Sequence, residues 1–363
     1  MKRIGKRRLT ALGAAVATAL VLPVSAQAAE TADIQDLLNA YQAEVGPGAG
    51  IYFGDSTGSQ ELSAGTSVIS AFRPIGSTDH YRIASQTKTF VAVVTLQLVD
   101  EGKVGLDDPI ERYLPGVVSG NGYDGNTITV RQLLQHTSGI PTNEAPNPAP
   151  SADGTYALEE LIRDGLSLPP ASAPGEQFHY SNTNFQLIGM MIEEVTGTSV
   201  GEQVTSRVIE PLGLADTSYP EAGDRSIPAP LVNGYIGGRV PPFHFWVDGT
   251  AWEPSFFGPA GSMISTQQDL TRFYQAVVGG ELMSPESRAE MLKTVPAHDG
   301  ASGLGILSYT LSCGVETWGH NGIVQGYITD TEVTTDGRHV STVTNSKIRS
   351  PKLRELVDAA ICS

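Results

Sequence analysis

The sequence predicts an α/β protein with an inserted all-α lobe, because strand-like runs lie near both ends of the chain and helical patterns fill the middle. Between about residues 105 and 225 strand signals are scarce, and loops rich in Pro, Gly and Asn link the helical stretches. The chain has 363 residues, more than one hydrophobic core usually holds. We therefore assign a sheet lobe to residues 29–86 and 226–363 and a helical lobe to residues 87–225.

The N-terminal elements open the sheet lobe. Apolar residues at helical spacing predict a helix over 29–45, which Gly46-Pro47-Gly48 ends. Two strand-like runs follow at 50–53 and 62–69. A strongly helical pattern then covers 87–101 and leads into the helical lobe.

Further patterns complete the two lobes. The segment 143–153 holds three prolines and no hydrophobic residue larger than alanine, and it reads as a loop. In the helical lobe, helices are expected near 129–136, 156–166, 182–196 and 199–209. In the C-terminal part, helices are expected at 266–278, 285–293 and 350–361, and strands at 304–312, 315–320, 324–333 and 339–345.

The first 28 residues (1–28) have the pattern of an export signal peptide. A basic start is followed by an apolar stretch from Leu9 to Val24, and Ala26-Gln27-Ala28 forms a small-residue cleavage site. The alternative is a membrane anchor, but the apolar stretch is shorter than the ~20 residues that span a bilayer. We expect cleavage before Ala29, no stable membrane anchor and a secreted product; Arg7-Arg8 leaves the export route open.

The chain is acidic. Its formal net charge is −16, with 23 basic and 39 acidic residues, and loss of the signal peptide would remove five basic residues and no acidic one. A surface of this kind favours solubility and argues against nucleic acid, or an anionic membrane, as a tightly held partner.

The two cysteines, Cys313 and Cys362, both lie near the C-terminus. In an exported protein oxidation is permitted, so a disulfide that ties the last helix to a strand is the favoured interpretation. Two free thiols are the alternative.

Ser85 and Lys88 lie at the start of the helix expected over 87–101. Residues three apart share one face of a helix, so Ser85 can pass its proton toward Lys88, and the helix N-terminus stabilises nearby negative charge. Chance often produces this spacing, yet of the five lysines after the signal peptide only Lys88 has a serine three positions before it. The pair is a candidate nucleophile and base.

Tyr180-Ser181-Asn182 precedes another expected helix, which Ser181 or Asn182 can cap. A phenol here can act as a general base if nearby cations lower its pKa, and Asn182 can hydrogen-bond a substrate amide. On its own the motif would be a helix cap beside a surface aromatic. Of the twelve tyrosines, however, only Tyr180 has asparagine two residues later.

His320-Asn321-Gly322 lies at the end of an expected strand. A polar side chain followed two residues later by glycine lets the edge of a strand approach an extended substrate closely. The backbone N–H groups of Ser85 and Ile323 can then form an oxyanion hole. Alone, His320 would be an ordinary strand-end histidine.

Ser85-x-x-Lys88, Tyr180-x-Asn182 and His320-x-Gly322, in that order, resemble the motifs of the serine penicillin-recognising hydrolases. The likeness is strongest to secreted actinomycete D-alanyl-D-alanine carboxypeptidases and more distant to class C β-lactamases and related esterases. Stretches such as 130–139 and 259–266 extend it over most of residues 35–362. The resemblance implies a β-lactamase/transpeptidase-like fold, with an antiparallel sheet flanked by helices and an inserted helical domain.

The resemblance also implies roles for single residues. Ser85 is the nucleophile that is acylated, Lys88 and Tyr180 move protons, and His320 is the polar group of the third element. No metal or organic cofactor is implied. His136 belongs to a recurrent motif of the family and is expected to be structural. The expected substrate-binding residues are Asn182, Asn321, Gly322, Ile323 and, as part of an aromatic wall, Phe256, with Phe257 as the alternative.

One departure from the carboxypeptidases concerns the free carboxylate of the substrate. They resemble each other in holding it with hydroxyl side chains just after the histidine and an arginine on the preceding strand. Here the first positions are Asn321 and Ile323, and the stretch 305–311 contains no arginine. A missing charge-assisted hydrogen bond, worth roughly 1.5–3 kcal/mol, would reduce selectivity for a free carboxylate by one to two orders of magnitude.

The leading hypothesis is a secreted, monomeric serine hydrolase that cleaves D-Ala-D-Ala-type peptides through a Ser85 acyl-enzyme. An esterase or amidase that acts on small acyl substrates is the alternative, followed by a weak β-lactamase. A non-catalytic penicillin-binding sensor is disfavoured because all three motifs are intact. The expected partners are thus a peptidoglycan stem peptide, an ester or a β-lactam.

Overall fold

The computed structural model describes residues 24–240 and 243–363. The signal peptide assigned to residues 1–28 lies mostly outside this part of the chain, so it stays a prediction together with secretion. The described chain begins in helix α1 (Val24–Val45), which includes the helix expected over 29–45.

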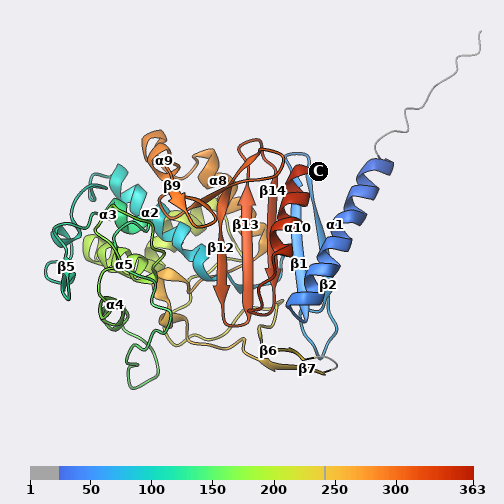
Figure 1. Cartoon of the computed structure of the whole chain (residues 1–363), viewed down its shortest axis with the longest axis horizontal. Helices are drawn as coiled ribbons and strands as arrows, with labels where there is room; N and C mark the ends of the chain where they lie inside the picture. The colour runs from blue at the N-terminus through green and yellow to red at the C-terminus, as the bar shows by residue number, and fades with distance from the viewer. Residues whose placement is uncertain (1–23, 241–242) are drawn as a thin grey trace, which may run out of the picture.

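An eight-stranded sheet forms the centre of the molecule (Figure 1), and all its strand pairs are antiparallel. The strand order is β2-β1-β14-β13-β12-β11-β10-β9, so strands from both ends of the chain lie side by side at the β1–β14 pair, as the division into lobes requires. The strands are β1 (Gly48–Asp55), β2 (Gly58–Gly65), β9 (Val295–Ala297), β10 (Gly300–Ser302), β11 (Leu307–Thr310), β12 (Glu316–Val324), β13 (Tyr327–Val333) and β14 (His339–Thr344).

Helices cover both faces of the sheet. On one face, α1 and the C-terminal α10 (Lys352–Cys362) pack together over β1 and β14, and a small core of buried residues such as Leu38, Ile51 and Ile361 lies beneath them. On the other face, α8 (Gln267–Gly279) packs against β13 and β14. The result is a layer of sheet between two layers of helix, as expected for amphipathic elements that bury their apolar faces.

The remaining helices gather beside the sheet on the left in Figure 1. One continuous hydrophobic core runs from the inner face of the sheet, at Val324 and Val343, into this helical part, at Leu133 and Met191. The length of the chain suggested separate lobes, but the lobes share this core. The helices are α2 (Thr87–Asp100), α3 (Val130–Leu134), α4 (Leu158–Leu166), α5 (Asn182–Thr196), α6 (Val200–Val204), α7 (Glu210–Leu212) and α9 (Pro285–Met291).

Several elements differ from the expectation. The strands expected at 315–320 and 324–333 are β12 and β13, but β12 continues through the glycines at 319 and 322 to Val324. The helix expected over 199–209 changes to a π-helical turn, η3 (Thr205–Ile209). The sequence analysis missed β9, β10, the hairpin β6 (Tyr235–Val240) and β7 (Phe243–Asp248), and the short strands β3 (Tyr81–Arg82), β4 (Ser119–Gly120), β5 (Tyr123–Asp124) and β8 (Ile264–Ser265).

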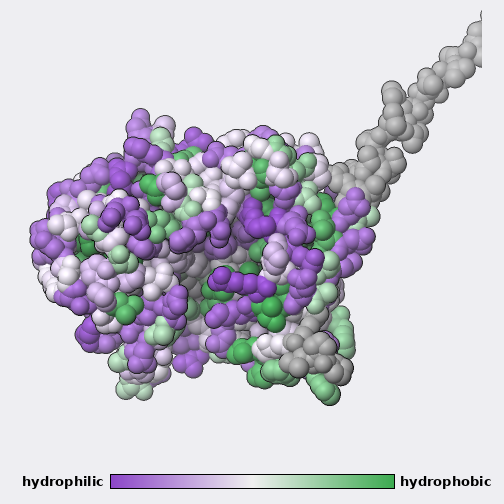
Figure 2. Space-filling model, viewed as in Figure 1, coloured by the Kyte–Doolittle hydropathy of each residue, from purple (hydrophilic) through white to green (hydrophobic). Residues whose placement is uncertain are grey.

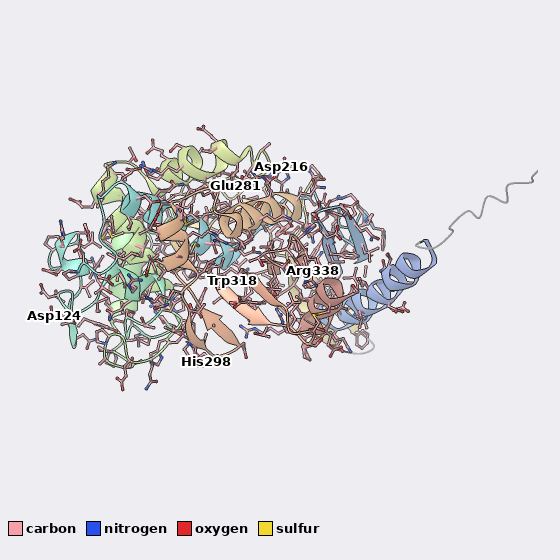
Figure 3. The ribbon with its side chains drawn as sticks, turned by 90° about the horizontal axis from the view of Figure 1, so that it is seen from above. Asp124, Asp216, Glu281, His298, Trp318 and Arg338 are labelled. Carbon is pink, nitrogen blue, oxygen red and sulfur yellow. A yellow bond between two sulfur atoms is a disulfide. The ribbon has the colours of Figure 1, made fainter. Side chains whose placement is uncertain are left out.

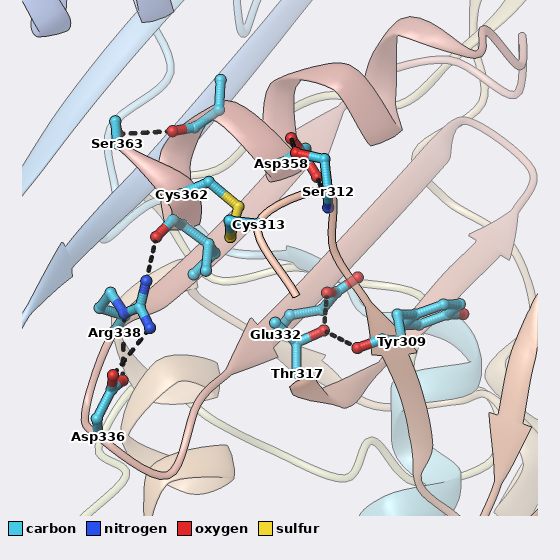
Figure 4. Close-up of a disulfide and its surroundings, with 12 residues drawn as sticks. Tyr309, Ser312, Cys313, Thr317, Glu332, Asp336, Arg338, Asp358, Cys362 and Ser363 are labelled. Carbon is cyan, nitrogen blue, oxygen red and sulfur yellow. Dashed lines mark hydrogen bonds and ion pairs between the residues drawn. A yellow bond between two sulfur atoms is a disulfide. The ribbon is translucent and has the colours of Figure 1, made fainter. Parts of the chain in front are cut away.

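The expected disulfide is present. Cys313, in the loop between β11 and β12, is bonded to Cys362, the last residue of α10 (Figure 4). Beside it, the Ser312 backbone N–H and hydroxyl donate hydrogen bonds of 2.7 and 2.5 Å to the Asp358 carboxylate. The disulfide and these bonds hold α10 against the loop that leads into β12, the strand of the predicted third motif.

The residues that the structure describes contain no helix that is long and apolar enough to cross a membrane. Nor do they bring three or more His, Cys, Asp or Glu side chains together in a group that could hold a metal ion.

Candidate active site

Ser85 lies in the short 3-10 helix η1 (Ala84–Gln86), which leads directly into α2. Ala84 has a φ of 52°, in the left-handed region that non-glycine residues rarely adopt. Such backbone strain is typical of functional sites. The turn thus presents Ser85 at the N-terminus of a buried helix.

Strand β12 packs against this turn at Gly322. A Cβ atom at position 322 would lie 2.2 Å from the carbonyl oxygen of Ile83 and 3.1 Å from the Ala84 side chain. Only glycine permits so close an approach. The predicted importance of Gly322 is therefore structural: it brings the edge of β12 up to the nucleophile.

Lys88 is fully buried next to Ser85. Its Nζ atom lies 3.1 Å from Ser85 Oγ, 2.8 Å from Asn182 Oδ1 and 2.6 Å from the carbonyl oxygen of Ala260, which belongs to η5 (Gly258–Ala260). Burial lowers the pKa of Lys88 well below its ordinary value, because the charged form loses its hydration. The site therefore favours a neutral amine.

The three partners of Lys88 determine what a neutral amine does there. Such an amine has two N–H donors and one lone pair. The oxygens of Asn182 and Ala260 can only accept, so they take the two N–H groups. Lys88 Nζ also donates to Ser85 Oγ in the structure, but of the three partners only the Ser85 hydroxyl can donate in return, so a neutral amine can accept its proton.

Tyr180 lies just before α5 and forms a side-chain hydrogen bond with Ser85. Burial raises the pKa of the Tyr180 phenol well above its ordinary value, although the bond to Ser85 opposes the shift. The sequence analysis allowed a phenolate base if cations lowered this pKa. The pKa shift has the opposite sign, because the site is buried, so the phenol stays protonated and is suited to donate a proton.

His136 packs behind Tyr180, with ring centroids 4.4 Å apart. Its Nδ1 atom lies 3.2 Å from the Ser181 backbone N–H nitrogen and 3.1 Å from Asn184 Nδ2. Burial, and then the nearby Lys88, lower the pKa of His136. The neutral ring thus fixes the segment that carries Tyr180, which agrees with a structural role.

Asn182 is the first residue of α5, and its side chain lines the cleft and holds Lys88. Neither residue caps the helix with its side chain as expected. Ser181 occupies the N-cap position, but its side chain makes no capping hydrogen bond, and Asn182 already belongs to the helix. Instead, the Ser181 backbone is held by His136. Asn182 therefore connects the second motif to the first.

His320 differs from the expected cleft-lining group. It is buried, its ring lies 6.3 Å from that of Tyr180, and its Nδ1 atom lies 2.6 Å from the Asn321 carbonyl oxygen. Burial and the nearby Lys88 lower the pKa of His320 to about 3. His320 thus stands behind the site as a neutral side chain, whereas Asn321 and Ile323 from the same strand line the cleft.

A cleft of about 510 Å³ opens in front of Ser85. Figure 2 shows the surface hollowed between the helical part and the sheet. Strand β11 pairs with β12 only as far as Gly319, so β12 from His320 to Val324 has no paired strand on that side. Its free N–H and C=O groups can bind an extended substrate as an added strand.

The cleft also contains residues that the sequence analysis missed. Of the two phenylalanines expected in the aromatic wall, Phe257 lines the cleft, while Phe256 packs edge-on against it with ring centroids 5.0 Å apart. The turn between β9 and β10, where Figure 3 labels His298, closes one side. No local motif marks these positions, because separate segments meet only in the fold. The other newly found lining residues include Thr142, Asn143, Phe178, Asp299, Tyr309, Lys347 and Arg349.

Comparisons with known proteins agree with this geometry. A family model described as "Beta-lactamase" matches residues 37–356. In the staphylococcal protein flp (Staphylococcus aureus, strain N315), 149 residues are 33% identical, which is 41% of this chain. This match covers 30% of flp, so the chain spans less than a third of that relative.

Solved structures match over nearly the whole chain. A D-stereospecific amidohydrolase from Streptomyces sp. is 37% identical, with a TM-score of 0.82 over 91% of this chain and 98% of the other. A D-amino acid amidase from Ochrobactrum anthropi SV3, in complex with D-phenylalanine, is 26% identical, with a TM-score of 0.80 over 92% of this chain and 98% of the other. A penicillin-binding protein from Bacillus halodurans, 22% identical with a TM-score of 0.72 over 88% of this chain and 96% of the other, shares the fold. The chain is therefore a member of the beta-lactamase family of serine hydrolases and has the β-lactamase/transpeptidase-like fold.

Proposed function

We propose that this protein hydrolyses amide bonds of D-amino-acid derivatives, including short D-peptides, through an acyl-enzyme on Ser85. The observation that carries the proposal is the buried Lys88 amine, whose Nζ atom lies 3.1 Å from Ser85 Oγ and within hydrogen-bond distance of Asn182 Oδ1 and the Ala260 carbonyl oxygen, and whose pKa is lowered by burial. Similarity to a D-stereospecific amidohydrolase and a D-amino acid amidase supports the substrate class.

Acylation follows from these contacts. Lys88 takes the hydroxyl proton as Ser85 Oγ attacks the substrate carbonyl carbon, and the oxyanion is placed to accept hydrogen bonds from the backbone N–H groups of Ser85 and Ile323. Tyr180 then donates its proton to the leaving nitrogen, and Tyr180 is reprotonated by the proton that Lys88 took from Ser85. The C–N bond breaks, the amine leaves and Ser85 carries the acyl group.

In deacylation water takes the place of Ser85 as the nucleophile. Water loses a proton to Lys88 as its oxygen attacks the ester carbonyl carbon. The bond to Ser85 Oγ then breaks, and Ser85 takes that proton back from Lys88. The products are a carboxylic acid and the free enzyme, so no redox partner is required.

A D-Ala-D-Ala carboxypeptidase is the second candidate, favoured by the order of the three motifs, and ester cleavage is compatible with the same chemistry. We keep secretion and a monomeric state as proposals that rest on the N-terminal sequence pattern and the acidic surface.

The test uses D-phenylalaninamide and D-alaninamide beside their L-enantiomers, with the wild-type protein and the Ser85→Ala variant. We expect ammonia release from the D-amides, at least tenfold faster than from the L-amides, and none with Ser85→Ala. Fluorescent penicillin should label the wild type and not the variant. Turnover that survives in Ser85→Ala, or equal rates with both enantiomers, would refute the proposal.

A further inference from the structure

Two basic side chains in the cleft have no partner within the described chain. Lys347 and Arg349 follow β14, are exposed, and line the cleft. Every other lysine or arginine whose side chain is described donates a hydrogen bond or forms an ion pair. In a chain with a net charge of −16, these two positive charges are thus available for a ligand.

The sheet places the segment after β14, which carries Lys347 and Arg349, beside the end of β12 that borders the cleft. Thr344, at the end of β14, pairs with Ile328 of β13, and Ile328 pairs with Ile323 of β12. The segment that carries Lys347 and Arg349 therefore starts level with Ile323. Asn321 and Ile323, where the resemblance led us to expect hydroxyl groups for a substrate carboxylate, line the same cleft.

The cleft is polarised. Asp299 is the acidic side chain among its lining residues, and it comes from the turn between β9 and β10. Strand β10 is separated from β12 by β11, whereas β14 lies on the opposite side of β12, beyond β13. The cations and the acid thus enter the cleft from opposite sides of β12, so an anionic group is favoured only at the side where the chain leaves β14.

We propose that Lys347 and Arg349 form a subsite for a carboxylate on the leaving group of the substrate. Guanidinium binds a carboxylate through paired hydrogen bonds, and ammonium adds a mobile point charge. This subsite would bind the substrate carboxylate in place of the arginine that is missing from β11. The inference rests on the proposed function and narrows it: D-peptides with a free C-terminal carboxylate are preferred to substrates with a neutral leaving group.

The kinetic test compares D-alanyl-D-alanine with D-alanyl-D-alaninol, in which a CH2OH group replaces the carboxylate and the scissile amide is unchanged. Because both cations are exposed and water screens them, we expect about a tenfold preference for the acid in kcat/KM, mostly through KM. The double variant Lys347→Gln/Arg349→Gln should lose this preference, with its kcat/KM for the acid falling to the value for the alcohol. Added salt should reduce the preference in the wild type.

Lys352→Gln is the matched control. It removes one positive charge close by on α10, where Lys352 pairs with Glu44 outside the cleft. The control should keep the preference for the acid. Equal kcat/KM for the two substrates in the wild type, or a preference that survives in the double variant, would overturn the subsite.

Binding to the Ser85→Ala variant separates this inference from the proposed function. Calorimetry should show tighter binding of D-alanyl-D-alanine than of D-alanyl-D-alaninol, and the difference should disappear when Lys347 and Arg349 are also replaced. This result supports the subsite even if the wild type hydrolyses no D-amide, and equal affinities contradict it even if the D-amides are hydrolysed.

Discussion

The Lys88 amine lies 2.6 Å from the backbone carbonyl oxygen of Ala260, a residue 172 positions later in the chain. This carbonyl cannot donate a hydrogen bond, so it takes one N–H of the neutral amine, as Asn182 Oδ1 takes the other. In a neutral amine these two contacts leave the lone pair of Lys88 for the proton of Ser85.

Replacement of Lys88 should abolish acylation without unfolding the protein. Lys88→Met keeps an unbranched side chain that is one atom shorter and removes a buried polar group, so the fold should persist, while Ser85 loses its base. We expect the rate of labelling by fluorescent penicillin to fall by about 10²–10⁴-fold, the usual contribution of a general base. Lys103→Met, at an exposed ion-pairing lysine just beyond α2, is the control and should label normally. Rapid labelling of Lys88→Met would exclude Lys88 as the base.

The pH profile of kcat/KM should show where Lys88 loses its proton. Activity needs the neutral amine, so it rises as the pH passes upward through the pKa of Lys88, which burial lowers. Because burial also raises the pKa of Tyr180, the phenol stays protonated through neutral and moderately alkaline pH. We therefore expect a broad plateau that already includes neutral pH. A rising limb near the ordinary pKa of lysine would contradict the account.

Buried His320 should make the fold sensitive to acid. Its pKa is about 3 in the folded protein and about 6.5 in an unfolded chain, so between these values only the unfolded chain binds the proton. The contribution to stability is complete above about pH 6.5 and is lost as the pH falls toward 3, on the order of 5 kcal/mol in total.

Urea unfolding at pH 7 and pH 4 measures this effect. His320→Gln should lose less stability between the two pH values than the wild type, although His136, also buried with a lowered pKa, keeps part of the dependence in both proteins. Identical losses in the two proteins would show that His320 is not held neutral.

Gly322 should tolerate no side chain. A Cβ atom there would lie 2.2 Å from the Ile83 carbonyl oxygen, so Gly322→Ala must push β12 away from the nucleophile turn. We expect kcat/KM to fall at least tenfold. Gly58→Ala is the matched control, because a Cβ atom at Gly58 would meet nothing within 4 Å. Equal activity of both variants would mean that the close approach of β12 is unimportant.

The Cys313–Cys362 disulfide should stabilise the fold more than it affects catalysis. It closes a loop across 49 positions, for which the chain-entropy model gives about 4 kcal/mol. The double variant Cys313→Ser/Cys362→Ser should unfold at a lower temperature and keep its activity well below that temperature. Differential scanning calorimetry and D-amide hydrolysis measure the two effects, and an unchanged unfolding temperature would be the contrary result.

The fold, the nucleophile and base pair, and the disulfide could be predicted from the sequence. The Ser85 and Lys88 pair depends on helical spacing, and the fold resemblance depends on three short motifs in a fixed order, so local patterns carried both. The disulfide followed from having only two cysteines in a chain expected to be exported.

Other features depend on contacts that no local pattern records. The Ala260 carbonyl reaches Lys88 from a distant turn, and the sign of the Tyr180 pKa shift depends on burial, which the motif itself does not reveal. Similarly, Lys347 and Arg349 lie more than twenty residues after the third motif, and only the sheet order brings them to the cleft.

The most direct test of the account is the protonation state of Lys88 itself. NMR spectroscopy of protein labelled with 13C at the lysine Cε atoms, with Lys88→Met to assign the signal, reports the charge of this one amine as the pH is varied. The account predicts that Lys88 is neutral at pH 7 and takes up its proton only at lower pH. A Lys88 signal that is protonated at pH 7 and titrates near the ordinary pKa of lysine would contradict it.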